Sequence, residues 1–431
     1  MGLRRIGVIF ALSGALLTGA LGSGHATATS SQASTSEPEI AEMVAAYLRD
    51  YPGIGADVAL RAATGQGERA TLVERLATSP GFGGARYDPI ANRLHIYAVD
   101  SAFESGVLKM AAGLNTDLAF EKATSSYRDL EALAGQINAT VSDDATRRSA
   151  IVAVADGSNN RVAVVVMDPG LLASAKSQYA TDARIVVRDF SQVHPDPTTC
   201  VSRTACGTPA RSGTVIGIDA DGSGSGSATQ LCSLGFTAAA TDGSKWIVTA
   251  GHCADGFTAT GCPSSNACWG AGQQYFGPMR SIGFSGNLDV GRIRKDNAYW
   301  ATGGYIYNAT APNSPLKVNY SILARSTIVV GDVVCQAVWH AITGSECGTV
   351  VNVASYQGLV ETSIDSCYGD SGGGWYALIG SQRWAYGIQS RADNGGICHG
   401  AGDHSYFSAI PDINAYWDST SGATIRVEVL P

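Results

Sequence analysis

Charged residues and basic clusters are scarce in this chain. Only 15% of its 431 residues are Asp, Glu, Lys or Arg, whereas an average soluble domain has roughly 25%. The net charge of −8 and the lack of a basic run argue against nucleic acid or an anionic membrane surface as a partner. Low charge combined with 52 glycines favours a turn-rich β protein over a helical one.

Cysteine is missing from the first part of the chain. All ten cysteines lie at or after Cys200, and their number is even. In an exported protein such cysteines are expected to form disulfides. We therefore expect two parts, of which only the C-terminal one is stabilised by disulfides in an oxidising compartment.

A long apolar run stands at the start of the sequence. Arg4 and Arg5 precede the uncharged segment 6–21, and Ala26 and Ala28 then supply an A-x-A cleavage pattern. This arrangement predicts a signal peptide over residues 1–28. A membrane anchor is the alternative, but the apolar run is short for a bilayer span. We therefore expect a secreted, extracellular protein that leaves the membrane once the signal is removed.

Residues 29–190 are predicted to form a small, cysteine-free α/β domain. Apolar side chains recur at helical spacing from Ile40 to Leu48, and the turn residues from Asp156 to Asn160 separate two alternating β runs. The same reasoning predicts helices within 68–77 and over 127–138, and strands over 85–87, 93–99, 151–155 and 161–167.

The C-terminal half has a different pattern. Residues 191–228 are expected to be a linker and processing region that contains the start of the mature chain. Residues 229–431 contain short β runs between Gly, Asn, Asp and Ser clusters, such as 236–240 and 245–249 around Asp242 and Gly243, and end in a short helix over 411–417. This pattern is typical of an antiparallel sandwich or barrel, so the fold class is mainly β.

Three segments of this half carry residues suited to amide hydrolysis by a hydroxyl. His252 lies in the pentad 249–253 after an apolar strand, and Ser371 lies in the glycine-rich segment 369–374. Such glycines allow a tight turn that aims the backbone N–H groups of Gly369 and Ser371 at a developing oxyanion. Asp289, within an apolar strand, is the favoured partner of the histidine, and Asp296 is the competing candidate.

These segments resemble the chymotrypsin family of serine proteases, in particular the bacterial branch that contains streptogrisins and α-lytic protease. The resemblance covers residues 230–417, and the order His, Asp, Ser agrees with it. It implies a double six-stranded antiparallel β-barrel with the active site between the barrels. It also implies three disulfides, to which we add two local pairs: Cys232–Cys253, Cys335–Cys347, Cys367–Cys398, and then Cys200–Cys206 and Cys262–Cys268.

The segments 82–94 and 159–164 resemble the first and last hairpins of that branch's pro-region. The resemblance implies that the N-terminal half assists folding, inhibits the protease and is then cut away, at a site between residues 190 and 215. We expect a self-processed monomer whose partners are its own pro-region and protein or peptide substrates. The chemistry requires no cofactor, and the cysteine spacing is too long for a typical zinc site.

The chain departs from the family pattern beside the nucleophile. Gln336 stands where the branch has an arginine that pairs with the buried aspartate, here Asp370, so that Asp370 needs another partner. Arg325 and a new N-terminal ammonium are the two candidates.

The residues that would contact substrate also differ. Asp365 takes the position of the specificity aspartate of trypsin, which implies a preference for Arg or Lys at the cleaved bond; a solvent-exposed loop aspartate is the alternative. Ser390 is expected to hydrogen-bond Asp289, and Ala392 to line a narrowed pocket that His404 approaches. Gln389 replaces the histidine of the glutamate-specific members.

A second class of function is a non-catalytic secreted binding protein that retains a protease fold. Degenerate members of the family normally lose a triad residue, whereas His252, Asp289 and Ser371 are all present. The sequence therefore favours the enzyme.

Overall fold

The structure is a computed structural model, and the statements below concern the residues that it describes. These are 37–142, 150–166, 168–189, 209–219, 228–254, 268–271, 274–298, 300–308, 315–341, 346–393 and 403–430. The chain divides into two compact units, Met1–Ala33 and Ser34–Pro431, and all described residues belong to the second. The predicted signal peptide lies outside the described residues.

Two helices open the described chain, α1 (Glu37–Asp50) and α2 (Ala56–Ala77), and they pack against each other. The helix predicted within 68–77 is therefore real but begins much earlier, after Gly55. Its first half buries small side chains such as Ala59 and Ala62, whose apolar periodicity is weak in the sequence because alanine contributes little hydrophobicity.

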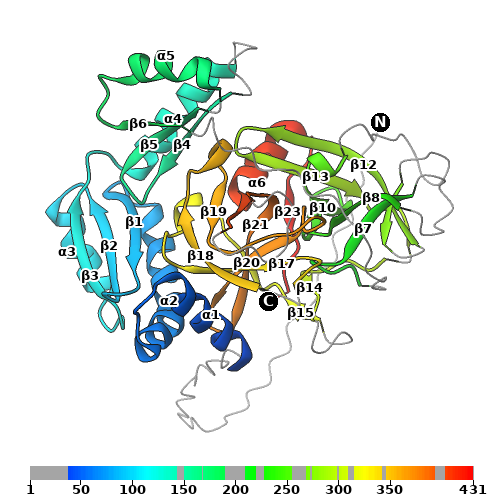
Figure 1. Cartoon of the computed structure of the whole chain (residues 1–431), viewed down its shortest axis with the longest axis horizontal. Coiled ribbons are helices and arrows are strands. Elements are labelled where there is room, and N and C mark those ends of the chain that lie inside the picture. Colours follow the sequence, from blue (N-terminus) through cyan, green and yellow to red (C-terminus); the bar gives the residue numbers. More distant parts are fainter. Residues whose placement is uncertain are drawn as a thin grey trace, which may run out of the picture. The chain divides into compact units, whose positions relative to one another are not determined.

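The rest of the N-terminal half contains two copies of one arrangement. An antiparallel hairpin is followed by a crossover helix and a third strand parallel to the second strand, and each copy forms its own three-stranded sheet (Figure 1). Both hairpins were predicted; the third strands and crossover helices were not. The first copy is β1 (Phe82–Asp88), β2 (Arg93–Ala98), α3 (Ser101–Met110) and β3 (Asp117–Lys122). After α4 (Tyr127–Ser142), the second is β4 (Ile151–Asp156), β5 (Arg161–Val166), α5 (Pro169–Tyr179) and β6 (Ile185–Asp189).

The C-terminal half begins with an eight-stranded sheet in the order β23-β9-β10-β13-β12-β11-β7-β8. The predicted hairpin around Asp242 and Gly243 is confirmed as β9 and β10, and Gly243 has the positive φ of +86° that this turn requires. The strands are β7 (Val215–Asp219), β8 (Ala228–Ser233), β9 (Thr237–Ala240), β10 (Lys245–Thr249), β11 (Cys268–Ala271), β12 (Gln274–Ser285), β13 (Leu288–Arg294) and β23 (Ile425–Val427).

A second large sheet follows, and six of its strands close into a barrel in the order β21-β20-β17-β18-β19-β22, with β22 paired back to β21. The strands are β16 (Tyr320–Ser321), β17 (Val333–Ala337), β18 (Glu346–Asn352), β19 (Val360–Thr362), β20 (Gly374–Ile379), β21 (Gln382–Ala392) and β22 (Ser405–Ala409). Short elements complete the half: β14 (Tyr305–Ile306), β15 (Leu316–Lys317), η1 (His252–Ala254), η2 (Arg325–Thr327), η3 (Tyr356–Gly358) and α6 (Ile410–Thr420). The mainly β fold with a chymotrypsin-like barrel is confirmed.

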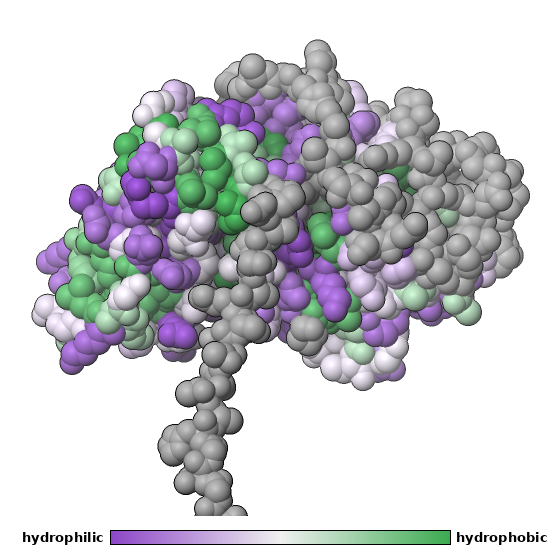
Figure 2. Space-filling view, turned by 90° about the horizontal axis from the view of Figure 1, so that it is seen from below, coloured by the Kyte–Doolittle hydropathy of each residue, from purple (hydrophilic) through white to green (hydrophobic). Residues whose placement is uncertain are grey.

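One hydrophobic core joins the two halves. It contains Met43 and Tyr47 of α1 together with Val333 and Val334 of β17, all at most 1% exposed. On the face drawn in Figure 2, apolar residues in green are broken up by polar residues in purple. Within the described residues, no helix combines the length and the apolar character that a bilayer crossing would require.

Candidate active site

His252, Asp289 and Ser371 come from three different elements and meet in hydrogen-bond contact. His252 opens η1 after strand β10, Asp289 lies on β13, and Ser371 lies in the turn before β20. The imidazole Nδ1 is 2.6 Å from Asp289 Oδ2, and Nε2 is 2.9 Å from Ser371 Oγ. The three side chains thus form one continuous chain of hydrogen bonds, although they are 37 and 119 residues apart in sequence.

The surroundings of Asp289 keep its carboxylate charged and fixed. Asp289 is 1% exposed, and its carboxylate oxygens also accept hydrogen bonds from the backbone N–H of His252 at 2.9 Å and from Ser390 Oγ at 2.6 Å. Burial by itself would raise the pKa of Asp289, but the electrostatic interaction with His252 and these hydrogen bonds hold the pKa below its usual range. The backbone N–H of Asp289 donates to Ser408 Oγ at 2.8 Å.

The turn that carries Ser371 is held by close packing that requires glycine at position 372 and by hydrogen bonds to Ser233. Gly372 has a φ of +86°, and a Cβ atom there would lie 2.0 Å from Thr249 Oγ1. The backbone N–H of the neighbouring Ser233 donates to Ser371 O at 2.7 Å, and Ser233 Oγ donates to Gly369 O at 2.8 Å. The turn therefore packs tightly against the first sheet of the C-terminal half.

Asp296, the competing partner for the histidine, lies elsewhere. Its carboxylate pairs with Arg294 Nε at 2.6 Å on the surface. Asp289 is the aspartate that contacts His252.

The residues predicted to contact substrate lie around the second barrel. Ala392 ends β21 and is 1% exposed, while the backbone O of Asp365 accepts a 2.7 Å hydrogen bond from Gln336 Nε2. His404 Nδ1 lies 2.5 Å from Glu361 Oε1, and this hydrogen bond raises the pKa of His404. The role of each in binding substrate stays a prediction.

The prediction that Arg325 pairs with Asp370 is wrong. That guanidinium instead pairs with Asp412 and donates to the backbone oxygens of Val353 and Gly358. Asp370 is contacted by His340, whose Nδ1 lies 3.1 Å from Asp370 Oδ1. No motif marks His340 in the sequence, and only its contact with the buried carboxylate identifies it.

Two of the predicted disulfides are present, Cys232–Cys253 and Cys335–Cys347. Cys367 is also disulfide-bonded, and its predicted partner Cys398 lies outside the described residues. The predicted pairs Cys200–Cys206 and Cys262–Cys268 likewise involve residues that the structure does not describe.

No protein-family model matches the chain. A curated relative, "Serine protease 2" of Streptomyces fradiae, is 29% identical over 157 residues, which are 34% of this chain and 80% of that protein. Three solved structures are also similar. Nocardiopsis protease NAPase is 23% identical and Thermobifida fusca Protease A is 24% identical; the matches cover 52% and 51% of this chain and 100% of each of those chains, both with a TM-score of 0.35. Alpha-lytic protease homolog N4 is 24% identical, and the match covers 49% of this chain and 98% of that chain with a TM-score of 0.37. The similarity of this chain is thus to bacterial serine proteases of the chymotrypsin family.

Proposed function

We propose that the chain is a serine endopeptidase that cleaves peptide bonds through an acyl-enzyme on Ser371. The observation that carries this proposal is the unbroken hydrogen-bond chain from Asp289 through His252 to Ser371, at 2.6 and 2.9 Å. A weakly acidic hydroxyl needs such a base to become a nucleophile, and the base needs an oriented tautomer. The similarity to a curated serine protease supports the same reading.

In the proposed mechanism, Ser371 Oγ gives its proton to His252 Nε2 as it attacks the carbonyl carbon of the substrate. The C–N bond then breaks, and the leaving amine takes that proton from the imidazolium. Asp289 holds Nδ1–H and stabilises the imidazolium charge. Water repeats the sequence to release the acid.

The backbone N–H groups of Gly369 and Ser371 would bind the oxyanion. Gly369 has a φ of +96°, which belongs to the left-handed region and suits a turn that points the N–H groups of Gly369 and Ser371 to one side. Each such donor contributes about 2.7–4 kcal/mol to transition-state stabilisation in serine proteases. The sequence of the turn therefore serves both the nucleophile and the oxyanion.

The test is a fluorophosphonate probe together with a peptide-hydrolysis assay. Ser371→Ala should lose probe labelling, hydrolysis and self-processing, because the attacking oxygen is gone. Ser419→Ala, at an exposed serine whose Oγ only donates to Tyr416 O, is the matched control and should keep all three. Labelling that persists in Ser371→Ala would mean that another residue is the reactive nucleophile and would contradict the role of Ser371. A wild type that neither labels nor hydrolyses would favour the non-catalytic binding protein.

We further infer that the chain is a secreted precursor and that residues 29–190 are its pro-region. Extensive contacts of the N-terminal half with the second barrel support this. The Gln66 side chain bonds both the N–H and the O of Val333, at 2.8 and 2.6 Å, and Asp50 accepts from Thr349 N at 3.1 Å. Arg188 donates to Asn352 Oδ1 at 2.8 Å. These buried and half-buried polar contacts are specific to this pair of surfaces.

The pro-region proposal is tested by refolding residues 200–431 with and without residues 29–190. An N-terminal half that assists folding should raise the yield of active enzyme, and the same half carrying Gln66→Ala should help less, because two backbone groups of Val333 lose their partners. Equal yields in all three mixtures would remove the folding role.

We propose a preference for Arg or Lys at the cleaved bond, on the basis of Asp365 alone. A carboxylate at the floor of a pocket would compensate a cationic side chain and reject an anionic one. Cleavage-site profiling on a peptide library tests this, and indifference to Arg and Lys would retire it.

A further inference from the structure

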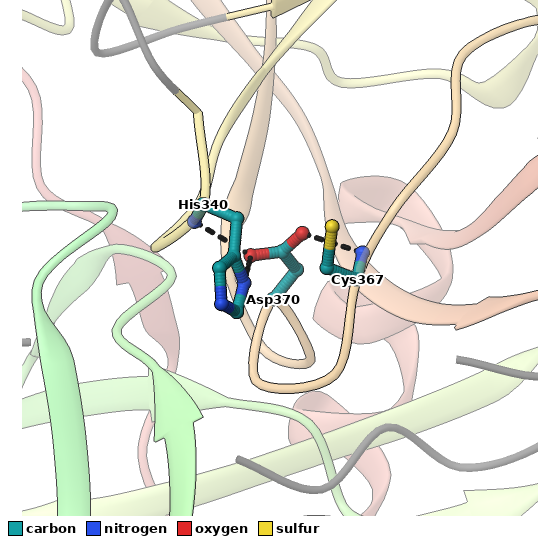
Figure 3. A group of neighbouring side chains, drawn as sticks. All are labelled: His340, Cys367 and Asp370. Atoms are coloured by element: carbon teal, nitrogen blue, oxygen red, sulfur yellow. Dashed lines mark hydrogen bonds and ion pairs between the residues drawn. The ribbon is translucent and has the colours of Figure 1, made fainter. Parts of the chain in front are cut away.

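Asp370, next to the nucleophile, is buried and held by four hydrogen bonds. The whole residue is only 1% exposed to solvent. Oδ1 accepts from the backbone N–H of His340 at 2.9 Å and lies 3.1 Å from the imidazole Nδ1 of the same residue. Oδ2 accepts from the backbone N–H of Cys367 at 2.7 Å and from Ser366 Oγ at 3.3 Å. In Figure 3 His340 and Cys367 lie on opposite sides of the carboxylate.

The cluster His340, Cys367 and Asp370 has the composition of a metal site, with ligand atoms within 4.8 Å of one another. The sulfur of Cys367 is in a disulfide, so it is not a thiolate ligand. Both carboxylate oxygens of Asp370 already accept N–H donors. The group is therefore better described as a charge partner for Asp370 than as a metal site.

The contacts of Asp370 and its neighbours define the shape of the Ser371 turn. The backbone N–H of Asp370 donates to Cys367 O at 3.1 Å, and Asp370 O accepts from Gly373 N at 2.9 Å. The segment that carries His340 also reaches the turn by a second route, because Trp339 N donates to Ser233 Oγ at 3.1 Å. A shift of His340 would thus move the turn that carries the nucleophile.

His340 is the one described side chain that can bring a positive charge to Asp370 within 4.0 Å. Its ring packs against Trp339 in a tilted arrangement, with an interplanar angle of 33° and centroids 4.1 Å apart, and its side chain is 29% exposed. A buried carboxylate without an opposite charge is costly, even when backbone N–H groups contact it.

We propose that His340 is the positioning residue that holds Asp370, and with it the Gly369–Ser371 turn, in the productive shape through its contacts with Asp370 Oδ1. This inference rests on the proposed peptidase function. Among described groups, Asp370 is the charged group that faces the imidazole, while the Trp339 ring and the disulfide sulfur of Cys367 are uncharged. Loss of this side chain would therefore leave the buried carboxylate with its backbone and Ser366 contacts alone and lower turnover.

The experiment compares His340→Ala and His340→Arg in the full-length gene, with kcat and KM measured for the processed enzymes on a fluorogenic peptide. His340→Ala, which removes the imidazole contact, should lower kcat by about tenfold, less than the loss of a whole oxyanion donor, and leave KM within about twofold. His340→Arg, which again offers N–H donors to the carboxylate, should recover most of kcat.

Arg426→Gln removes a charge from an exposed ion pair with Asp418 in the same half and should keep the wild-type kcat and KM. A His340→Ala enzyme with wild-type kcat, or a His340→Arg enzyme that is no more active than His340→Ala, overturns the proposal. A wild type that fails to cleave peptides or to label with a fluorophosphonate overturns the peptidase function instead. The two failures are therefore distinguishable.

Discussion

Replacing Arg69 with methionine should destabilise the precursor strongly, because Arg69 joins the two halves through a buried ion pair. Its Nη2 lies 2.9 Å and its Nε 3.3 Å from Asp332 Oδ1, and the two side chains are 0% and 4% exposed. The guanidinium also lies 3.5 Å over the Tyr87 ring. Removing one partner of such a pair leaves an unpaired charge in the core, which costs about 3–5 kcal/mol.

The double variant Arg69→Met/Asp332→Leu separates this cost from the general loss of packing. It removes both charges, and buried pairs replaced by apolar residues of similar volume are often neutral or stabilising. The exposed pair Arg61–Asp57, with side chains 51% and 73% exposed, is the control: Arg61→Met should cost less than about 1 kcal/mol.

The free energy of unfolding is measured by urea denaturation of the full-length chain, followed by tryptophan fluorescence and circular dichroism. Ser371→Ala serves as the background, so that self-processing does not change the sample. The result that would refute the reasoning is a double variant as unstable as Arg69→Met, because the cost would then come from shape and not from the unpaired Asp332 carboxylate.

Three further predictions follow from single residues. Gly372→Ala should destabilise the chain by at least about 2 kcal/mol, because its Cβ would strike Thr249 at a positive φ; a thermal melt like that of the parent would contradict this. The pKa of His404 is raised in the folded state by its hydrogen bond to Glu361. This bond therefore stabilises the fold fully below the unfolded-state pKa of about 6.5, and the stabilisation is lost as pH rises through the higher folded-state pKa. The difference in melting temperature between the wild type and His404→Gln should accordingly shrink from acidic to alkaline pH. Asp365→Ser should reduce any preference for Arg or Lys by about tenfold or more in library profiling, since a full charge partner is lost.

Local signals predicted the hairpins and the candidate triad. The turn at Asp242 and Gly243 specifies its own register, and the two glycine-flanked motifs around His252 and Ser371 restrict the backbone wherever they occur. Asp289 was chosen because an aspartate in an apolar strand needs a partner, and the structure has it 2.6 Å from the imidazole.

Other features depend on contacts that no short pattern contains. The third strands β3 and β6 have burial patterns without the alternation that identifies a half-buried strand, and each exists because a crossover helix returns the chain beside its neighbour. Arg69 and Asp332 are 263 residues apart, so their pairing is not visible locally. His340 is adjacent to no motif and was missed for the same reason.

The core shared by α1 and β17 has a consequence for how the enzyme would be released. A single cut between residues 190 and 215 breaks the covalent link but leaves the packing of Met43 and Tyr47 against Val333 intact. The nicked product should therefore migrate as one particle under native conditions and as two bands after denaturation. Liberation of the C-terminal fragment would need a second scission within the N-terminal fragment, so that the rate of that later degradation, and not the first cut, would set the onset of activity.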